Sequence, residues 1–300
     1  MTRMKESGID WIGQIPEEWE MSKIRYLVTT RSEKRITDSS VPYIGLENIE
    51  SQTGKFVKTG IQVDKSENIV VEIGDVLFGK LRPYLRKYWR ATFPSTASSE
   101  FLVFQSSELD MNFLYYAIQS DSFIEEVNTS TYGSKMPRAS WEYIKNMRIA
   151  FPTSLVEQQK IADFLDKKTA QLDKVKSLLE EQIQKLKDYR ASLIYETVTK
   201  GLDKTVPMKD SGIDWIGQVP EGWEVKRLKD YVDFQTGTTP PQSIGVNQER
   251  EGVRWFKPGD FSDESVDLTS AENYITSEIV KQQKLSVYPE KTILVVGIAS

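Results

Sequence analysis

The sequence predicts an α+β protein: a mixed α/β domain, then a long coiled-coil-type spacer helix, then the start of a second domain similar to the first. Three observations lead to this prediction. An 18-residue leader occurs twice, short apolar runs bounded by turn residues follow each leader, and a long helical repeat separates the two halves. The predicted boundaries are residues 1–152 for the first domain, 153–201 for the helix and 202–300 for the second domain.

The leader Met4–Met21 recurs as Met208–Val225, with four differences and an offset of 204 residues. A period of this length is too long for a solenoid and indicates a duplicated domain with the same entry segment each time. Each leader carries two tryptophans: Trp11 and Trp19, then Trp215 and Trp223. Stacking on nucleic-acid bases is one interpretation. The Pro-Glu-x-Trp turn favours a structural role, with the tryptophans as apolar anchors.

Short apolar runs between glycines and polar residues predict strands of the first domain at 42–44, 69–71, 76–78, 101–104 and 147–151. Helices are expected at 111–118 and 123–127, entered from Asp110 and Ser122. In the second half, the runs 253–256 and 292–297 parallel 41–44 and 75–79. The first copy continues for about 70 residues past the second of these runs, whereas the sequence stops at Ser300. We therefore expect an incomplete second domain and a chain that is a fragment.

A long helix is predicted from Ser154 to Lys200. Ser154 and Glu157 have the spacing of a capping box, and Gly201 stands where a left-handed C-terminal cap is expected. Apolar residues follow in steps of three and four, with Lys168 and Gln182 as polar interruptions: Ile161, Leu165, Leu172, Val175, Leu179, Leu186, Tyr189 and Leu193. Burial in a large α-helical core is the alternative interpretation, but a stripe this narrow between charged faces favours pairing with another helix.

Composition excludes several classes of function. The chain has no histidine and no cysteine, which removes the usual general base, the usual zinc ligands and any disulfide framework. The net charge of −5 argues against a protein that coats nucleic acid without selectivity. No apolar stretch has the length of a membrane span or the form of a signal peptide, so we expect a cytoplasmic protein without a membrane partner.

Two stretches depart from this acidic total. Gly79–Thr92 contains Lys80, Arg82, Arg86, Lys87 and Arg90 and no acidic residue, and it also carries Tyr84, Tyr88 and Trp89. Gly133–Arg138 combines small residues with two cations and a hydroxyl. Such side chains suit contacts to phosphates and to guanine edges. The alternative is a solvated strand whose cations face water.

Motifs of catalysis are absent from the sequence. It contains no P-loop, no Gly-x-Gly-x-x-Gly, no Gly-x-Ser-x-Gly and no Asn-Pro-Pro-aromatic tetrad of adenine methyltransferases. Gly74-Asp75 is interpreted as a turn before a strand. A stand-alone nuclease or methyltransferase is therefore a weak hypothesis, and the chain is expected to recognise or scaffold and not to catalyse.

Several motifs together resemble the DNA-specificity subunit of type I restriction–modification systems. They are the Glu-x-Trp leaders, Gly74–Phe78 running into Lys80–Arg86, Phe151-Pro152 followed by Glu157–Asp166, and the later run Leu186–Ile194. The resemblance covers the whole chain. It implies two target-recognition domains that each read one half of a split DNA site, held apart by two long antiparallel helices.

The resemblance also implies partners. Methylation would belong to a separate modification subunit that uses S-adenosylmethionine, and cleavage to an ATP-driven restriction subunit, so the chain itself would be a non-enzyme with no cofactor. The residues expected near double-stranded DNA are those of the two basic stretches: Lys80, Arg82, Tyr84, Arg86, Lys87, Ser134, Lys135 and Arg138. The alternative from another class is a coiled-coil adaptor that binds proteins and never touches DNA.

Overall fold

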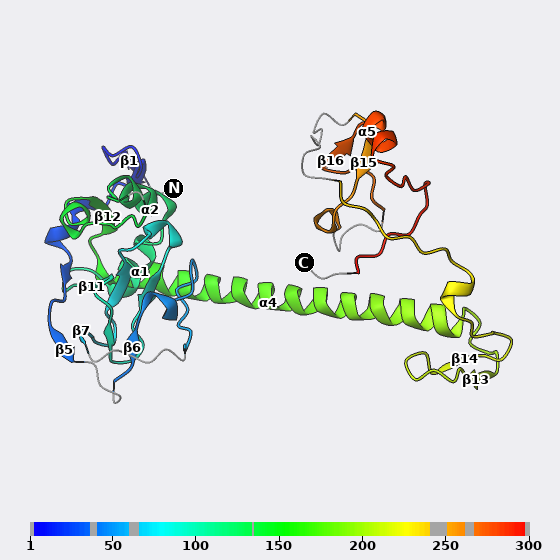
Figure 1. Cartoon of the computed structure of the whole chain (residues 1–300). Helices are drawn as coiled ribbons and strands as arrows, with labels where there is room; N and C mark the ends of the chain where they lie inside the picture. The colour runs from blue at the N-terminus through cyan, green and yellow to red at the C-terminus, as the bar shows by residue number, and fades with distance from the viewer. Residues whose placement is uncertain are drawn as a thin grey trace. The chain divides into compact units, whose positions relative to one another are not determined.

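The computed structural model describes residues 3–36, 41–59, 66–133, 135–240, 251–261 and 267–297. The chain divides into two compact units, Met1–Arg190 and Ala191–Ser300. In Figure 1 the first unit is coloured from blue to yellow-green and the second from there to red. The first contains a mixed α/β domain followed by most of the long helix α4, Leu155–Lys200.

Two four-stranded sheets form the framework of the first unit. One has the order β4-β11-β8-β9 and is antiparallel throughout, with strands Thr29–Thr30, Phe101–Gln105, Val76–Gly79 and Tyr88–Arg90. The other has the order β5-β7-β10-β6, with strands Lys34–Ile36, Glu67–Val71, Ser95–Ala97 and Tyr43–Ile44. Only the β10–β6 pair is parallel among these described strands.

Strands β8 and β11 lie between two apolar clusters, which explains why both are continuous apolar runs. Successive side chains of a strand point to opposite faces. Val76 and Phe78 accordingly belong to one cluster, while Leu77 between them belongs to the other. Along β11, Leu102 and Phe104 alternate in the same way with Phe101 and Val103. Strands buried on both faces lack the polar alternation of a surface strand.

Three helices pack on the larger cluster: α1 (Met111–Ala117), α2 (Asp121–Thr129) and α3 (Trp141–Ile144). The Asp110 carboxylate accepts the backbone N–H of Phe113 at 2.9 Å, which confirms the predicted cap of α1. The predicted cap of α2 at Ser122 is wrong. Ser120 caps that helix by accepting the N–H of Phe123 at 3.3 Å, so the helix begins two residues earlier than its apolar positions indicate.

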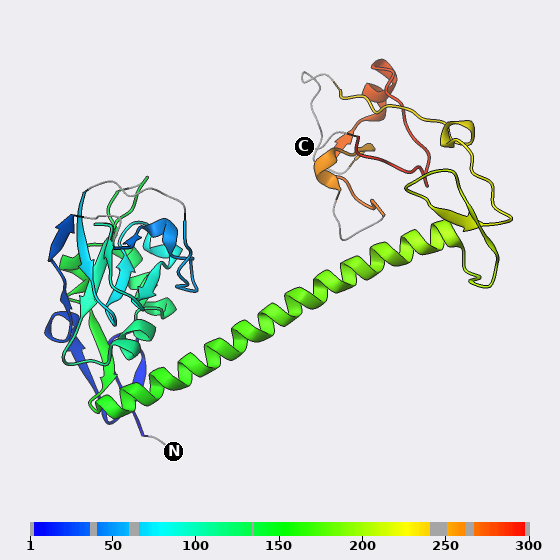
Figure 2. The same ribbon diagram turned by 90° about the horizontal axis from the view of Figure 1, so that it is seen from below.

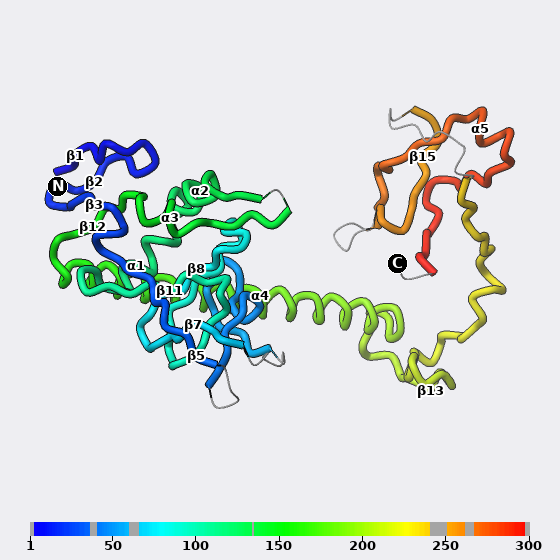
Figure 3. The backbone as a smooth tube through the Cα atoms, turned by 60° about the vertical axis from the view of Figure 1, so that its left-hand side comes forward, coloured from blue at the N-terminus to red at the C-terminus, as the bar shows by residue number. Residues whose placement is uncertain are grey.

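The entry and the exit of the first domain lie side by side. Strand β3 (Trp19–Lys23) pairs antiparallel with β12 (Arg148–Pro152), which leads directly into α4 (Figure 3). The Trp19 ring meets Phe113 edge-on at 6.2 Å between centroids, and its indole N–H donates to the Glu157 carboxylate at 3.2 Å. Trp11 and Trp19 pack half-buried against the core, which confirms their role as anchors in the first copy.

The repeated leader forms the same hairpin twice. Strand β1 (Met4–Glu6) pairs with β2 (Gln14–Pro16), and β13 (Met208–Asp210) pairs with β14 (Gln218–Pro220) in the same register. The glycines that open and close each turn adopt positive φ at matching places, Gly8 and Gly13, then Gly212 and Gly217. A positive φ costs glycine little, so the shared sequence specifies the shared turn.

The second unit repeats a further detail of the first. After β6, the 3₁₀ turn Leu46–Asn48 is closed by the Asn48 side chain, which accepts the N–H of Gly45 at 2.9 Å. After β15 (Val253–Trp255), the turn Pro258–Asp260 is closed by Asp260, which accepts the N–H of Lys257 at 2.6 Å. This match supports the similarity of the two domains.

Among the described residues, the second unit has one further pair of strands and one α-helix. Strand β15 pairs with β16 (Asn273–Ile275), and α5 (Ser277–Gln282) follows. The other described 3₁₀ turns of the chain are η1 (Ile24–Tyr26), η3 (Pro83–Leu85) and η4 (Leu228–Asp230). The run 292–297, which parallels the strand at 75–79 in sequence, forms no strand. Within the described residues no strand pairs with it, and Ile293 and Val295 are exposed, so the ladder that would define the strand is missing.

Helix α4 confirms the predicted long helix. Its 46 residues correspond to a rod of about 69 Å at ~1.5 Å per residue. Ser154 Oγ accepts the N–H of Glu157 at 3.4 Å, while the Glu157 carboxylate bonds to Trp19 and not back to the cap as the capping box predicts. At the other end Gly201 has φ +74°, and its N–H donates to the Thr197 carbonyl at 3.1 Å. Figure 2 shows the helix running beyond the sheets of the first unit.

Gln158 fastens the start of α4 to the domain. Its side chain is fully buried, its amide nitrogen donates to the Pro152 carbonyl at 2.8 Å, and its oxygen accepts the N–H of Asp110 at 2.8 Å. The nitrogen and the oxygen of the Gln158 amide thus each have a hydrogen-bond partner within the protein. Gln158 lies in the run Glu157–Asp166 that carries the family resemblance, but its burial was not predicted, because a glutamine in a charged helix gives no pattern of burial.

We expect Gln158→Leu to destabilise the protein by about 2–4 kcal/mol, because two buried backbone groups lose their partner. Urea unfolding followed by circular dichroism would measure the change. Gln159→Leu is the matched control, since among the described residues the Gln159 amide bonds to Asp163 of the same helix alone. Equal effects of the two substitutions would contradict the anchoring role.

Candidate nucleic-acid interface

The structure brings the two basic stretches together. Leu81 and Arg138 form an antiparallel bridge, the N–H of Arg82 donates to the Pro137 carbonyl at 2.7 Å, and the N–H of Ala139 donates to the Lys80 carbonyl at 3.0 Å. Residues more than 50 positions apart in sequence therefore form one continuous surface. We call Lys80–Lys87 together with the described residues of 132–138 the basic loop pair.

The first loop of this pair contains two non-glycine residues in the left-handed region. Arg82 has φ +52° and Arg86 has φ +53°, on either side of the 3₁₀ turn Pro83–Leu85. Each such residue costs of the order of 1 kcal/mol or more, and it persists only where the surroundings enforce it. Here two backbone hydrogen bonds enforce it: the N–H of Arg82 donates to the Pro137 carbonyl, and the N–H of Gln52 donates to the Arg86 carbonyl. Strained backbone of this kind is concentrated at functional sites.

Several predicted cations are engaged within the protein. The Lys87 ammonium donates to the carbonyls of Leu46 and Ile49, both at 2.7 Å, and so stabilises the 3₁₀ turn after β6. Arg86 forms an ion pair of 2.6 Å with Asp121 in the first turn of α2. These side chains hold the loop against the domain, which the sequence stretch alone did not reveal.

Lys80, Glu100 and Arg138 form a cluster at the base of the loop pair. Arg138 donates to both oxygens of Glu100, with the shortest distance 2.8 Å. These hydrogen bonds lower the pKa of the Glu100 carboxyl below its ordinary value, in spite of its burial. Burial lowers the pKa of Lys80, an effect that Arg138 reinforces and Glu100 opposes. The cluster therefore joins the two loops.

Three predicted residues remain accessible. Arg82, Tyr84 and Lys135 are exposed, and neither Arg82 nor Lys135 has an ion-pair partner among the described residues. Tyr84 keeps 51% of its surface accessible. Ser134 lies outside the described residues. Tyr132, beside Gly133, is also accessible, with 64% of its surface exposed. It was not predicted, although an aromatic residue next to a basic loop is a signal that could have pointed to it.

The predicted helix seam divides into two parts. Ile161 packs against the domain core and Leu165 is half-buried. The other six positions are exposed by about half or more: Leu172, Val175, Leu179, Leu186, Tyr189 and Leu193. An apolar stripe of this length is unusual on a free surface and is typical of interaction sites.

We expect the isolated chain to self-associate through this stripe. Sedimentation velocity should show a mass that rises with concentration in the micromolar range, and Leu179→Lys with Leu186→Lys should shift the chain towards monomer, since charges oppose a buried seam. Ser177→Lys with Gln184→Lys, two exposed positions on the opposite side of α4, is the control and should change nothing. A concentration-independent monomer before any substitution would count against the seam.

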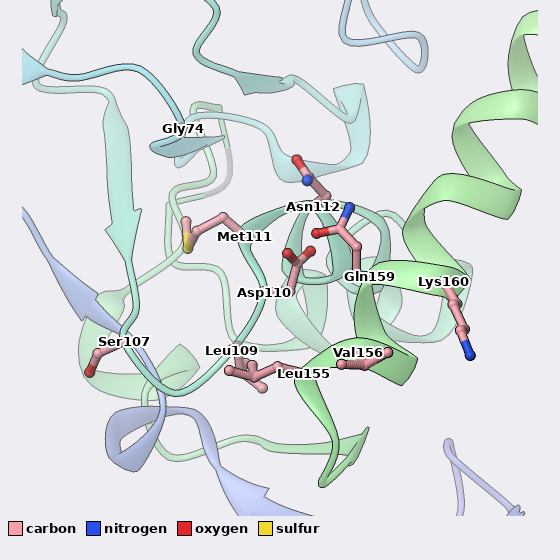
Figure 4. A pocket seen from close by; sticks show the side chains of 10 residues that line it. All are labelled: Gly74, Ser107, Leu109, Asp110, Met111, Asn112, Leu155, Val156, Gln159 and Lys160. Atoms are coloured by element: carbon pink, nitrogen blue, oxygen red, sulfur yellow. The ribbon is translucent and has the colours of Figure 1, made fainter.

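An open pocket of about 610 Å³ lies where α4 leaves the domain. It is lined by Gly74, Ser107, Leu109, Asp110, Met111, Asn112, Leu155, Val156, Gln159 and Lys160 (Figure 4). Its one carboxylate, Asp110, serves as the cap of α1. In the part of the chain that the structure describes, no group of three or more acidic side chains could hold a metal ion. None of the described helices is long and apolar enough to cross a membrane.

Comparison with known proteins gives a consistent result. The chain is 24% identical over 300 residues to the MjaVIII type I restriction enzyme specificity subunit of Methanocaldococcus jannaschii, in a match that covers 92% of this chain and 62% of that protein. It is 28% identical over 199 residues to the EcoBI specificity subunit of Escherichia coli, covering 64% of this chain and 40% of that protein. The chain thus spans less than two thirds of the length of both relatives.

Two solved structures share the fold. The HsdS subunit of Thermoanaerobacter tengcongensis gives a TM-score of 0.51 at 22% identity, covering 86% of this chain and 64% of that one. The second is a chain from a structure concerned with complex assembly and conformational transition of the type I R-M system. It gives a TM-score of 0.59 at 23% identity, and the match covers 83% of this chain and 63% of that one.

The sequence also matches a family described as the type I restriction modification DNA specificity domain, over residues 16–187. These residues include the basic loop pair and most of α4, and they make up more than half of the chain. The chain therefore belongs to the family of type I restriction–modification DNA specificity domains.

Proposed function

We propose that the chain is the non-catalytic specificity subunit of a type I restriction–modification system. It reads a bipartite site in double-stranded DNA and directs separate methyltransferase and restriction subunits to it. S-adenosylmethionine and ATP bind those partners, and the complex works in the cytoplasm, where the chromosome lies. Family membership and the names of the relatives support the role in specificity. The repeated leader hairpin supports two recognition domains.

The observation that carries the proposal is the basic loop pair. In an acidic chain, it places the exposed Arg82 and Tyr84 on one strained turn and joins that turn to the loop that carries the exposed Lys135. Arginine is the side chain that most often reads guanine, through two parallel hydrogen bonds in the major groove, and lysine contacts phosphates. We propose Arg82, Tyr84 and Lys135 as the DNA contacts of the first domain. Lys80, Arg86, Lys87 and Arg138 keep the loops in place and add to the positive field.

The proposal is tested by mapping methylated bases in cells of the natural host, with the gene present and deleted. We expect one bipartite motif that disappears on deletion and returns when the gene is restored. The adaptor hypothesis predicts that methylation persists without the gene. Binding of the purified complex of this chain and its methyltransferase to DNA with and without the motif is the matched test in solution.

A further inference from the structure

One face of helix α4 carries a line of contacts to the first domain from Gln158 to Asp173. Gln158 and Ala162 on this face are fully buried, and Asp166, Thr169 and Asp173 follow at steps of four, three and four. Steps of three and four place residues on one side of a helix. From Asp166 onwards, the described contacts between this face and the first domain are hydrogen bonds and ion pairs. The one furthest along the helix is the ion pair of Asp173 with Lys55 at 2.6 Å.

Asp166 is the centre of the polar contacts. Arg90 donates to both carboxylate oxygens, at 3.1 and 3.2 Å, and the Tyr116 hydroxyl donates to one of them at 2.5 Å. Arg90 is itself held by Asn112 at 2.8 Å and lies 5.3 Å from the centre of the Tyr115 ring. A two-point arginine–carboxylate bond fixes direction as well as distance. We call Arg90, Tyr116 and Asp166 the clamp.

The charge on Asp166 and the exposure of the neighbouring ion pair favour the clamp as the main polar contact between α4 and the first domain. Burial alone would raise the pKa of Asp166, but the hydrogen bonds from Tyr116 and Arg90 outweigh it and lower that pKa below the ordinary value. The carboxylate is therefore charged at neutral pH and binds both donors. The Lys55–Asp173 pair is exposed on both sides, and exposed pairs contribute little.

The clamped face differs from the helix seam. At 100° per residue, positions 158, 162, 166, 169 and 173 centre about 110° around the helix from the seam positions. The first domain can therefore hold α4 while the exposed part of the seam, from Leu172 onwards, contacts a second helix. A small change in the angle of α4 at the clamp displaces the far end of the helix by a large distance. A tilt of about 10° at Asp166 would move the end of α4, 34 residues on, by about 9 Å, or close to three base pairs of DNA.

We infer that the clamp is a positioning device: Asp166, gripped by Arg90 and Tyr116, fixes the angle at which α4 leaves the first recognition domain. For its consequence in DNA recognition this inference rests on the proposed function, since the same angle then sets the gap between the two half-sites. None of the three clamp residues lies in the part of the basic loop pair proposed to touch DNA.

The angle can be measured on the chain itself. Because the chain contains no cysteine, cysteines introduced at the exposed positions Glu125 and Lys187 can be spin-labelled, and pulsed electron resonance then gives the distance distribution between α2 and α4. We expect one narrow distribution in the parent chain. Asp166→Ala should broaden or shift it by about 5 Å, since residue 187 lies about 30 Å beyond the clamp.

Matched variants separate positioning from loss of structure. Asp163→Ala is the control, because the hydrogen bond described for the Asp163 side chain comes from Gln159 of the same helix, and it should leave the distribution unchanged. The exchange Arg90→Asp with Asp166→Arg should restore a narrow distribution. Thermal unfolding of each variant shows whether it is folded. An unchanged distribution in folded Asp166→Ala would overturn the inference.

The consequence is tested by methylation mapping in the natural host. Asp166→Ala should keep both half-site sequences but admit gaps one or more base pairs longer or shorter, and the charge exchange should restore the single gap. A changed half-site, or a single unchanged gap, would overturn the link between clamp and gap. If the parent gene gives no bipartite motif, the proposed function fails, while the distance measurement still decides whether the clamp sets the angle.

Discussion

Replacing Arg82 with alanine should weaken binding of the assembled complex to its DNA target by about 1–3 kcal/mol, roughly fivefold to 150-fold, if the guanidinium reads a base edge. Arg82 is exposed, it has no ion-pair partner among the described residues, and its left-handed backbone is held in place by Pro137. Arg86→Ala should have a smaller effect, because Arg86 is already paired with Asp121.

Titration of labelled DNA at several salt concentrations distinguishes the kinds of contact. If Arg82 touches only phosphate, the loss should be the same on all sequences and the salt dependence shallower by about one unit. Arg148→Ala, an exposed arginine of β12 outside the basic loop pair, is the control. Unchanged affinity in both Arg82→Ala and Lys135→Ala would favour the alternative in which these cations merely face water.

The parts of the fold that could be predicted from sequence are those with a strong local signal. Helix α4 was predicted within two residues at each end, because its period, its serine cap and Gly201 all agree. Strands β8 and β11 were predicted because burial on both faces makes each a continuous apolar run. The run 292–297 has the same local signal and forms no strand, since a strand also needs a neighbour.

The candidate site was predictable in composition but not in arrangement. The two basic stretches are evident as charge runs, yet the Leu81–Arg138 bridge that joins them is a tertiary contact with no local sequence signal. For the same reason the partners of the cations could not be foreseen. Glu100, Asp121 and the carbonyls after β6 are distant in sequence, and they determine which cations remain accessible.

The clamp residues were missed for a related reason. Asp166 belongs to a motif that carries the family resemblance, but in a helix dense with charge nothing distinguishes it from Asp163. Only the fold shows that Asp166 meets Arg90 and Tyr116, whereas Asp163 meets a residue of its own helix.

Lengthening α4 by one heptad should lengthen the gap between the two half-sites and leave the half-sites themselves unchanged. The insertion would lie near Ser177, beyond the clamp, with an equal insertion in the second long helix that the family resemblance implies. Seven residues keep the seam in register and add about 10 Å, close to three base pairs. Three base pairs also turn the groove by roughly 100°. If the domains cannot rotate to follow it, the gap should lengthen by fewer than about three base pairs.

A four-residue insertion in one helix is the control for this design. It breaks the register of the seam, so it should abolish methylation without producing a new gap. Loss of methylation in the heptad variant as well would show that the domains cannot rotate by this amount.

The most direct test of bipartite recognition along a helical spacer is therefore the methylated motif of the paired heptad variant, read by sequencing the host chromosome. Both half-sites retained, with a gap up to about three base pairs longer, is the predicted result. Methylation at the original gap, or at altered half-site sequences, would contradict it.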